Sequence, residues 1–245
     1  LCPVFGPVPK EKIGELVLRY PYASYGNIRN WQDYIYYAGD LRDFVGKKYA
    51  GQRNHIKKFP AACPNAVFTV LTDNNSPMIE RFWEEYSSEF SKNDSESAKK
   101  ELKLSRELMP KLVGEGFFLG GFVDSGRLLS LSLGEKCGET IIVHIEKALY
   151  SCPGVYPATV QAFARQFAGG VRYLNREDDA ADKGLRTSKL QYGPDHMGYK
   201  YWFETKNELM VHIEEIPEIK TDRLTLSAIC EEDIPDYNKI LLDTD

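Results

Sequence analysis

The sequence has no long hydrophobic run and no excess of basic residues. No stretch approaches the ~20 consecutive apolar residues that a membrane helix needs, so we expect no transmembrane segment. The net charge is −5, which argues against an attraction of the whole chain to nucleic acid or to an anionic lipid surface. Any such contact needs a local basic patch, and we expect no DNA partner.

Cysteines are too few and too scattered to form a metal or disulfide framework. They are odd in number and contain no Cys-x-x-Cys pair, which excludes a zinc ribbon and is typical of a reducing compartment. The chain also lacks a basic-then-apolar leader, so it is expected to be cytoplasmic. Each cysteine is expected to be a small buried hydrophobe. The cysteines are Cys2, Cys63, Cys137, Cys152 and Cys230.

The pattern of apolar residues predicts an α/β (α+β) protein of one large or two small domains. Turn residues separate most of the expected elements, and Asp124-Ser-Gly126 is expected to be a hairpin turn. The expected helices are 11–19, 41–59 in two pieces broken near Gly46 or Gly51, 78–90, 98–112 and 157–167. The expected strands are 33–37, 65–71, 116–123, 127–133, 139–147 and 171–174.

In the strand expected at 139–147, His144 and Glu146 alternate with the apolar residues Val143 and Ile145. Strict alternation places His144 and Glu146 on one face. Val143 and Ile145 then share the other face. A carboxylate on an apolar strand costs free energy unless it is paired, and its pKa tends to rise, which suits a general base. Glu146 is the first candidate base and His144 the second. Equally, Glu146 could form a structural ion pair with Lys147, Arg176 or Arg186.

Charges of both signs are dense between residues 173 and 192. This density suits either a surface turn with weak ion pairs or a polar site that holds a ligand. Asp182 is expected to be the N-cap of a helix. Arg186 and Lys189 would then lie three apart on one face, where they could clamp an anion.

The same segment resembles the closing motif of the DUF2156 family, the phosphatidylglycerol lysyltransferase C-terminal-like domains. Earlier parts of the family pattern are matched in the same order, first by segments 34–36 and 46–59 and then by 143–148 and 154–156, so that the resemblance covers about 31–203. The usual Ser-Tyr-His-Pro ending is altered here to Gln191-Tyr-Gly-Pro194. The residues that match the closing motif are Asn175, Arg176, Glu177, Asp179, Gly184, Leu185, Arg186, Lys189 and Tyr192.

This resemblance implies a GNAT-like acyltransferase fold, with a mixed central sheet flanked by helices. It also implies transfer of an aminoacyl or acyl group to an amine or hydroxyl acceptor, either a small molecule or a lipid head group. Two alternatives stay open: a coenzyme A-dependent N-acetyltransferase, and a catalytically silent ligand-binding or scaffolding module. In family terms, 1–30 is the tail of a preceding GNAT-like half, 31–205 is the DUF2156 domain, and 206–245 is a closing strand and the truncated start of a second, ribosomal-protein-type acetyltransferase domain.

Two further segments gain candidate roles from the resemblance. Basic and polar residues near 47–58 could bind phosphates of a tRNA end, a nucleotide or a lipid head group, although a solvated basic face is the common outcome for such a run. The turn before helix 157–167 is where a GNAT donor's pyrophosphate would meet backbone N–H groups, but its prolines remove two donors. The residues singled out are Lys48, Arg53, Asn54 and Lys58 in the first segment, and Gly154 and Tyr156 in the second.

In the leading hypothesis the catalytic candidates are Glu146, His144 and Glu177. The cations Arg176, Arg186 and Lys189 hold an anionic donor. Glu177 and Asp179 orient those cations, and Asn175 and Tyr192 complete the substrate site. No metal is implied. No cofactor is certain, and the donor is either an aminoacyl-tRNA or acetyl-CoA.

Overall fold

The computed structural model describes residues 3–90, 96–206, 219–220 and 225–226. Its contacts divide the chain into two units, 1–26 with 202–245 and 27–201. Most of the segment expected to begin a second acetyltransferase domain lies outside the described residues. The described part of this segment forms two short strands paired antiparallel, β12 (Ile219–Lys220) and β13 (Thr225–Leu226).

The smaller unit is built around a three-stranded sheet with the order β1-β11-β2. Helix α1 follows β1 directly and buries Ile13, one of the apolar residues whose spacing predicted this helix. The elements are β1 (Val4–Pro9), α1 (Lys10–Arg19), β2 (Ser24–Asn27) and β11 (Lys200–Glu204).

The larger unit contains a mixed sheet with the order β10-β3-β9-β8-β7-β5-β4, and β6 pairs with β5 beside this path. Among the described strands of this sheet, β8 and β9 are the one pair that runs parallel. The strands are β3 (Asp33–Tyr37), β4 (Val67–Val70), β5 (Phe117–Asp124), β6 (Arg127–Leu128), β7 (Ser130–Cys137), β8 (Thr140–Ala148), β9 (Tyr173–Asn175) and β10 (His196–Gly198). The expected mixed sheet flanked by helices is confirmed.

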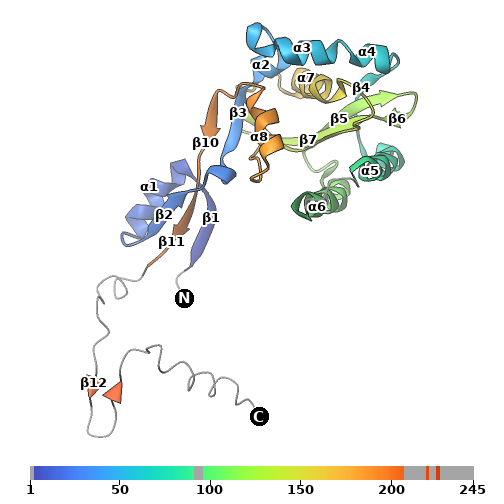
Figure 1. The fold of residues 1–245 in the computed structure, drawn as a ribbon. Coiled ribbons are helices and arrows are strands. Elements are labelled where there is room, and N and C mark those ends of the chain that lie inside the picture. Colours follow the sequence, from blue (N-terminus) through green and yellow to red (C-terminus); the bar gives the residue numbers. More distant parts are fainter. Residues whose placement is uncertain (1–2, 91–95, 207–218, 221–224, 227–245) are drawn as a thin grey trace, which may run out of the picture. The chain divides into compact units, whose positions relative to one another are not determined.

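Helices cover both faces of this sheet, with α2, α3, α4 and α7 on one side and α5 and α6 on the other (Figure 1). The expected break at Gly46 is confirmed, because this glycine has a φ of 90° and separates α2 from the next turn of helix. The helices are α2 (Ala38–Asp43), α3 (Ala50–Ile56), α4 (Phe59–Ala62), α5 (Ser76–Phe90), α6 (Glu96–Leu112), α7 (Val155–Phe167) and α8 (Lys183–Leu190), with single 3-10 turns at Arg29–Trp31, Lys47–Tyr49 and Asp73–Asn75.

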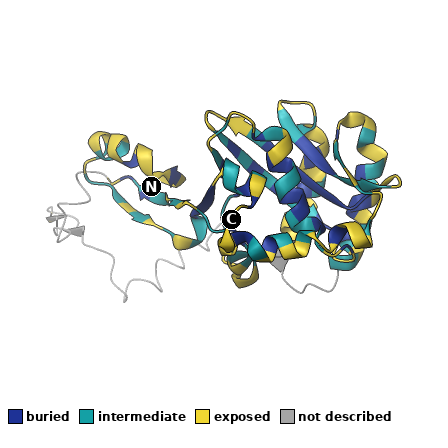
Figure 2. Ribbon diagram, turned by 90° about the horizontal axis from the view of Figure 1, so that it is seen from above, coloured by how far each residue is buried: buried dark blue, intermediate teal, exposed yellow. Residues whose placement is uncertain are grey.

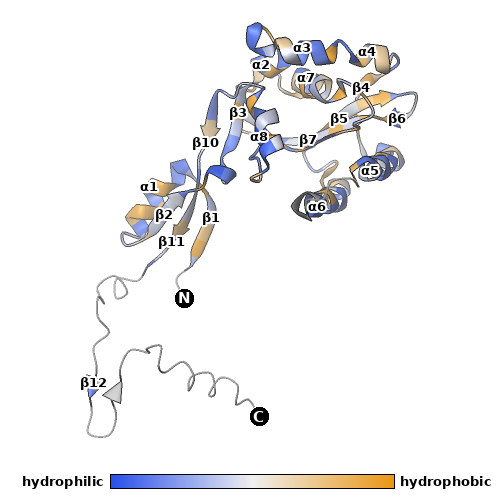
Figure 3. Ribbon diagram, in the orientation of Figure 1, coloured by the Kyte–Doolittle hydropathy of each residue, from blue (hydrophilic) through white to orange (hydrophobic). Residues whose placement is uncertain are grey.

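Apolar side chains form two clusters in the larger unit. Trp83 of α5 and Met109 of α6 pack in one cluster with Ile145 of β8. Val143 of β8 and Phe163 of α7 belong to the other. The strands are accordingly buried and the outward sides of the helices exposed (Figure 2). Hydropathy follows the same division, with β5 hydrophobic and α6 largely hydrophilic (Figure 3).

Several local expectations can be compared with the structure. The hairpin turn is confirmed, since Asp124 pairs with Arg127 across two residues of positive φ, Ser125 and Gly126, as a tight hairpin requires. The single strand expected over 127–133 is instead two strands, β6 and β7.

The cysteines do not share one environment. Cys152 is buried and Cys63 half-buried, but Cys137 is exposed at the end of β7, so the expectation that every cysteine is buried is wrong. Cys2 and Cys230 lie outside the described residues. Among the helices that are described, none is both long and apolar enough to cross a bilayer. The expected cytoplasmic location stays a prediction.

Candidate active site

A β-bulge in β8 decides which polar side chains can meet. Val143 and Ile145 pair with two adjacent residues of β7, so His144 is the extra residue of the pair. A bulge of this kind reverses the alternation of the strand beyond it. Val143 and Ile145 consequently belong to different apolar clusters. The expectation that His144 and Glu146 share a face is therefore wrong.

His144 lies between two carboxylates. Its Nδ1 is 2.7 Å from Oε1 of Glu177, and its Nε2 is 3.2 Å from Oε1 of Glu135. The hydrogen bond to Glu177 is the largest of the effects that raise the pKa of His144, and it outweighs desolvation, which acts in the opposite direction. This is the environment of a histidine that exchanges protons near neutral pH.

The imidazole opens into a cavity of about 590 Å³ between α6 and the sheet. The histidine and both carboxylates belong to its lining. Helix α6 contributes three leucines to the wall, beside three polar residues. The lining residues are Lys100, Glu101, Leu104, Ser105, Leu108, Leu112, Phe117, Glu135, His144, Ile145 and Glu177.

Glu177 reaches His144 from a loop of unusual backbone conformation. Its φ is 54°, in the left-handed region that non-glycine residues rarely adopt. Its backbone N–H donates to Oδ1 of Asn175 at 2.8 Å, and its carbonyl accepts from the N–H of Tyr34 at 3.1 Å. Asn175 also donates to Asp33 at 2.8 Å. These bonds fix the loop in the conformation that directs Glu177 toward the imidazole.

Lys189 stabilises the same loop through its side-chain ammonium. Its ammonium donates to the carbonyls of Arg176 at 2.5 Å, of Glu177 at 3.3 Å and of Asp178. The residue is 8% exposed, and desolvation lowers its pKa to about 8. An ammonium has three hydrogens, and each has a backbone acceptor here. The ammonium of Lys189 therefore binds backbone carbonyls of its own chain. The sequence had suggested that it binds the anionic acyl donor.

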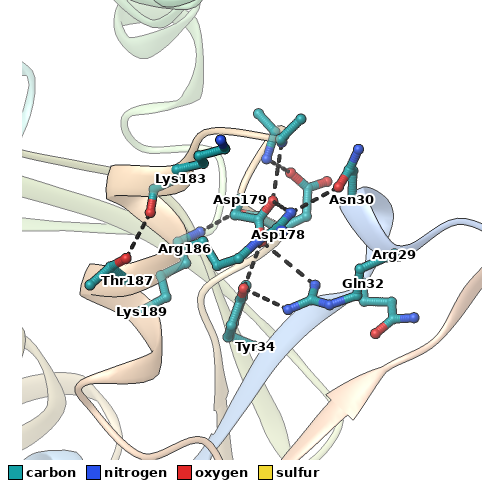
Figure 4. Close-up of polar contacts among 12 residues, drawn as sticks. Arg29, Asn30, Gln32, Tyr34, Asp178, Asp179, Lys183, Arg186, Thr187 and Lys189 are labelled. Atoms are coloured by element: carbon teal, nitrogen blue, oxygen red, sulfur yellow. Dashed lines mark hydrogen bonds and ion pairs between the residues drawn. The ribbon is translucent and has the colours of Figure 1, made fainter.

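Asp179 forms the centre of a second network (Figure 4). Its carboxylate accepts from Nε and Nη2 of Arg186 at 2.8 and 2.9 Å, and from the hydroxyl of Tyr34 at 2.6 Å. Arg186 also donates to Asn30 at 2.8 Å. The hydrogen bonds from Arg186 are the main reason that the pKa of Asp179 falls to about 2. The expected N-cap of α8, Asp182, is confirmed. The expected clamp is not formed, because Arg186 and Lys189 bind different partners.

Glu146 points to the opposite face and pairs with Arg176. Both Nε and Nη2 of the arginine lie 2.7 Å from Oε2 of Glu146, and Nη2 also donates to the hydroxyl of Tyr156 at 3.2 Å. The ring of Tyr192 stacks 4.5 Å from the guanidinium. Desolvation is the largest single effect and acts to lower the pKa of Arg176, but the charge of Glu146, together with Tyr156, Tyr36 and Tyr192, outweighs it and the pKa is raised. Of the two alternatives for Glu146, the ion pair is therefore present.

The basic segment lies on the other side of the sheet from the His144 cavity, since α3 and α6 cover opposite faces (Figure 1). Lys48 pairs with Asp40 at 2.7 Å. Arg53 donates to two backbone carbonyls at 2.6 and 2.7 Å around the break at Gly46. Asn54 and Lys58 are exposed. These four residues are thus not brought together with His144.

Gly154, the N-cap residue of α7, has a packing role in the turn that precedes this helix. Its φ is 81°, and a Cβ placed on it would lie 2.1 Å from the carbonyl oxygen of His55. Only glycine fits a position with that conformation and that close approach. The end of α3 therefore packs directly against this residue, and the donor contact that the resemblance implied for the turn stays a prediction.

Sequence reasoning missed Glu135 and the leucines in the wall of the cavity. Glu135 stands next to the glycine of β7 where the register shifts, and strict alternation gave no reason to place it beside His144. Leu104 and Leu108 lie four apart on α6, which was a visible signal, but their spacing suited an ordinary core stripe equally well.

Residues 10–204 match the family described as phosphatidylglycerol lysyltransferase, C-terminal. The chain belongs to this family. Its resemblance to DUF2156 is thereby confirmed, as are its GNAT-like fold and its class, acyltransferase. No curated protein matches the chain.

Solved structures agree with this phosphatidylglycerol lysyltransferase C-terminal fold. A conserved protein of unknown function from Bacteroides thetaiotaomicron VPI-5482 is 28% identical, with a TM-score of 0.73 over 84% of this chain and 69% of that one. L-PGS from Bacillus licheniformis is 14% identical, with a TM-score of 0.59 over 86% and 70%. The DUF2156 domain of a putative lysylphosphatidylglycerol synthetase from Agrobacterium fabrum is 9% identical, with a TM-score of 0.58 over 83% and 68%. At these identities the last two show the fold alone.

Proposed function

We propose that this acyltransferase moves an aminoacyl or acyl group from an activated donor to an amine or hydroxyl acceptor in the cavity, with His144 as the general base. One observation carries the proposal: the imidazole lies between Glu177 and Glu135 at 2.7 and 3.2 Å, inside a cavity of about 590 Å³. Acyl transfer requires removal of a proton from the attacking amine or hydroxyl, and His144 is placed to accept it.

The two carboxylates have different roles in this proposal. Glu177 makes the shorter bond, to Nδ1, and so fixes the tautomer and the orientation of the ring, as the carboxylate of a catalytic triad does. Glu135 can accept a hydrogen bond only from a protonated Nε2, so in the neutral imidazole, which has its hydrogen on Nδ1, Nε2 carries a lone pair that takes the proton of the acceptor. The nearby negative charges stabilise the imidazolium that forms as the proton is transferred.

Glu146, the first candidate from the sequence, is not the base in this proposal. Its carboxylate is paired with a buried guanidinium, and it is not among the residues that line the cavity. Arg186 remains the candidate for contact with an anionic donor, because its side chain is 32% exposed.

The test is transfer of labelled acyl groups by the His144→Ala variant, with aminoacyl-tRNA and acetyl-CoA as alternative donors and phosphatidylglycerol vesicles or small amines as acceptors. We expect a loss of about 100-fold or more, the usual contribution of a general base. His55→Ala is the matched control, since His55 is an exposed histidine on α3, and it should transfer at the normal rate. Normal transfer by a folded His144→Ala protein would contradict the proposal.

A further inference from the structure

The polar lining of the cavity has acceptor capacity that His144 does not use. Each carboxylate has two oxygens and about four acceptor positions, and Glu135 and Glu177 each direct one oxygen to the imidazole. Their side chains are 43% and 41% exposed. The trio carries a net negative charge whether or not the imidazole is protonated. Such an arrangement accepts hydrogen bonds from a cationic donor.

The other lining charges do not reverse this preference. Glu101 is bound by Lys147 at 2.8 Å and by the hydroxyl of Ser105 at 3.0 Å. Lys100 is exposed on α6, where its flexible side chain can extend into water. The part of the cavity at His144 therefore attracts cations and repels carboxylates and phosphates.

The wall along α6 is suited to a hydrocarbon chain. Leu104 and Leu108 lie one helical turn apart, and each is 46% exposed, although they line the cavity with Phe117 and Ile145. Apolar side chains on one helix face normally pack into a core. Here they stay exposed and line the same cavity as the two carboxylates, so a ligand that fills the cavity can place an aliphatic segment against them.

From this combination we propose that the acceptor is an aliphatic primary amine, whose ammonium binds between Glu135 and Glu177 and whose chain lies along Leu104 and Leu108. The inference rests on the proposed function and names its acceptor. The bound ammonium releases one proton to solvent. The nitrogen then attacks the carbonyl carbon of the donor ester, His144 takes the second proton as the C–N bond forms, and that proton passes to the leaving oxygen as the C–O bond breaks. The product is an amide.

Binding to the whole chain can be measured by calorimetry with octylamine, octanol and octanoate, which have the same chain and different head groups. We expect octylamine to bind about ten-fold more tightly than octanol, because hydrogen bonds to charged groups are the stronger ones, and octanoate to bind most weakly. Butylamine should bind less tightly than octylamine. Octanoate binding as tightly as octylamine, or equal affinities for the two amines, would overturn the inference.

Substitutions test which residues cause the preference for octylamine over octanol. Glu135→Gln and Glu177→Gln should each reduce the preference for octylamine over octanol, with octanol binding unchanged, whereas Leu108→Ser should weaken both ligands. Glu84→Gln, at an exposed position on α5, is the matched control. A preference that persists in the Glu135→Gln and Glu177→Gln variants would exclude this site.

The same alkylammonium chemistry could instead belong to the side chain of an aminoacyl donor. Mass spectrometry of a reaction with donor and octylamine separates these sources. N-acyl-octylamine supports the acceptor role; competition with the donor, without acylation of the amine, overturns it. Because binding is measured without turnover, a full transfer rate in His144→Ala would refute the proposed base and leave the ligand preference to be judged independently.

Discussion

The carboxylate of Glu146 lies 2.7 Å from the guanidinium of Arg176, and the arginine side chain is only 2% exposed. Removing one member of a buried pair leaves the other charged and uncompensated, which costs about 3–5 kcal/mol. The cost of losing both is smaller, since apolar residues of similar volume can replace a buried pair. The relationship therefore assigns to Glu146 a role in stability.

We predict that Glu146→Ala and Arg176→Met each lower the free energy of unfolding by about 3 kcal/mol or more, as measured by urea denaturation. The double variant should be less destabilised than the sum of the two single variants. Glu84→Ala serves as the control for loss of an exposed carboxylate. Additive effects in the double variant would show that the two side chains do not act as a pair.

The transfer rate should rise with pH through the pKa of His144. Hydrogen bonds to Glu177 and Glu135 raise this pKa, so the base becomes available only above the ordinary histidine value of about 6.5. In Glu177→Gln the midpoint of the pH–rate profile should move toward lower pH. A profile whose midpoint is the same in both proteins would show that this hydrogen bond does not set the pH dependence of the rate.

The Asp179–Arg186 pair should contribute an acid-sensitive part of the stability. Arg186 depresses the pKa of Asp179 from 3.8 to about 2, so the stabilisation is fully present above the unfolded value and is lost as the pH falls from about 4 to about 2. Thermal melts of the native chain and of Arg186→Gln should converge across this window. Melting temperatures that differ by a constant amount would contradict the assignment.

Lys189 should act on His144 from a distance, as a positioning residue. In Lys189→Met the carbonyls of Arg176, Glu177 and Asp178 lose their shared donor, and we expect the bond from Glu177 to His144 to weaken. The pKa of His144, followed by NMR, should then fall toward its ordinary value. Lys183→Met removes an exposed lysine from the same helix and should leave that pKa unchanged. An unshifted His144 in a folded Lys189→Met protein would show that the loop is held by its other bonds.

Much of the fold was predictable because it depends on local rules. Apolar periodicity indicated most helices and strands, the glycine at 46 marked the helix break, and Asp182 marked the start of α8. The family motif also directed attention to Glu177, which lies beside the cavity. Each of these signals is carried by residues near one another in the chain.

The grouping of the polar side chains was not predictable from the same rules. Which face of the sheet each side chain of β8 occupies depends on the bulge. The bulge arises from the pairing of β8 with β7, which is a relationship between two strands. Whether Arg176 contacts solvent or a buried carboxylate depends likewise on the tyrosines that pack over it from β3, α7 and the segment after α8. Sequence spacing contains neither kind of information.

The additional residue in β8 places His144 and Glu146 on opposite faces of one strand, so that each face has its own polar group. Under the proposed function, changes around His144 alter which molecule reacts without disturbing the ion pair on the opposite face, because the two groups of side chains share a backbone but no common surface. Deleting one residue at this point would place both groups on the same face. The carboxylate of Glu146 would then serve both the stability of the fold and the reaction.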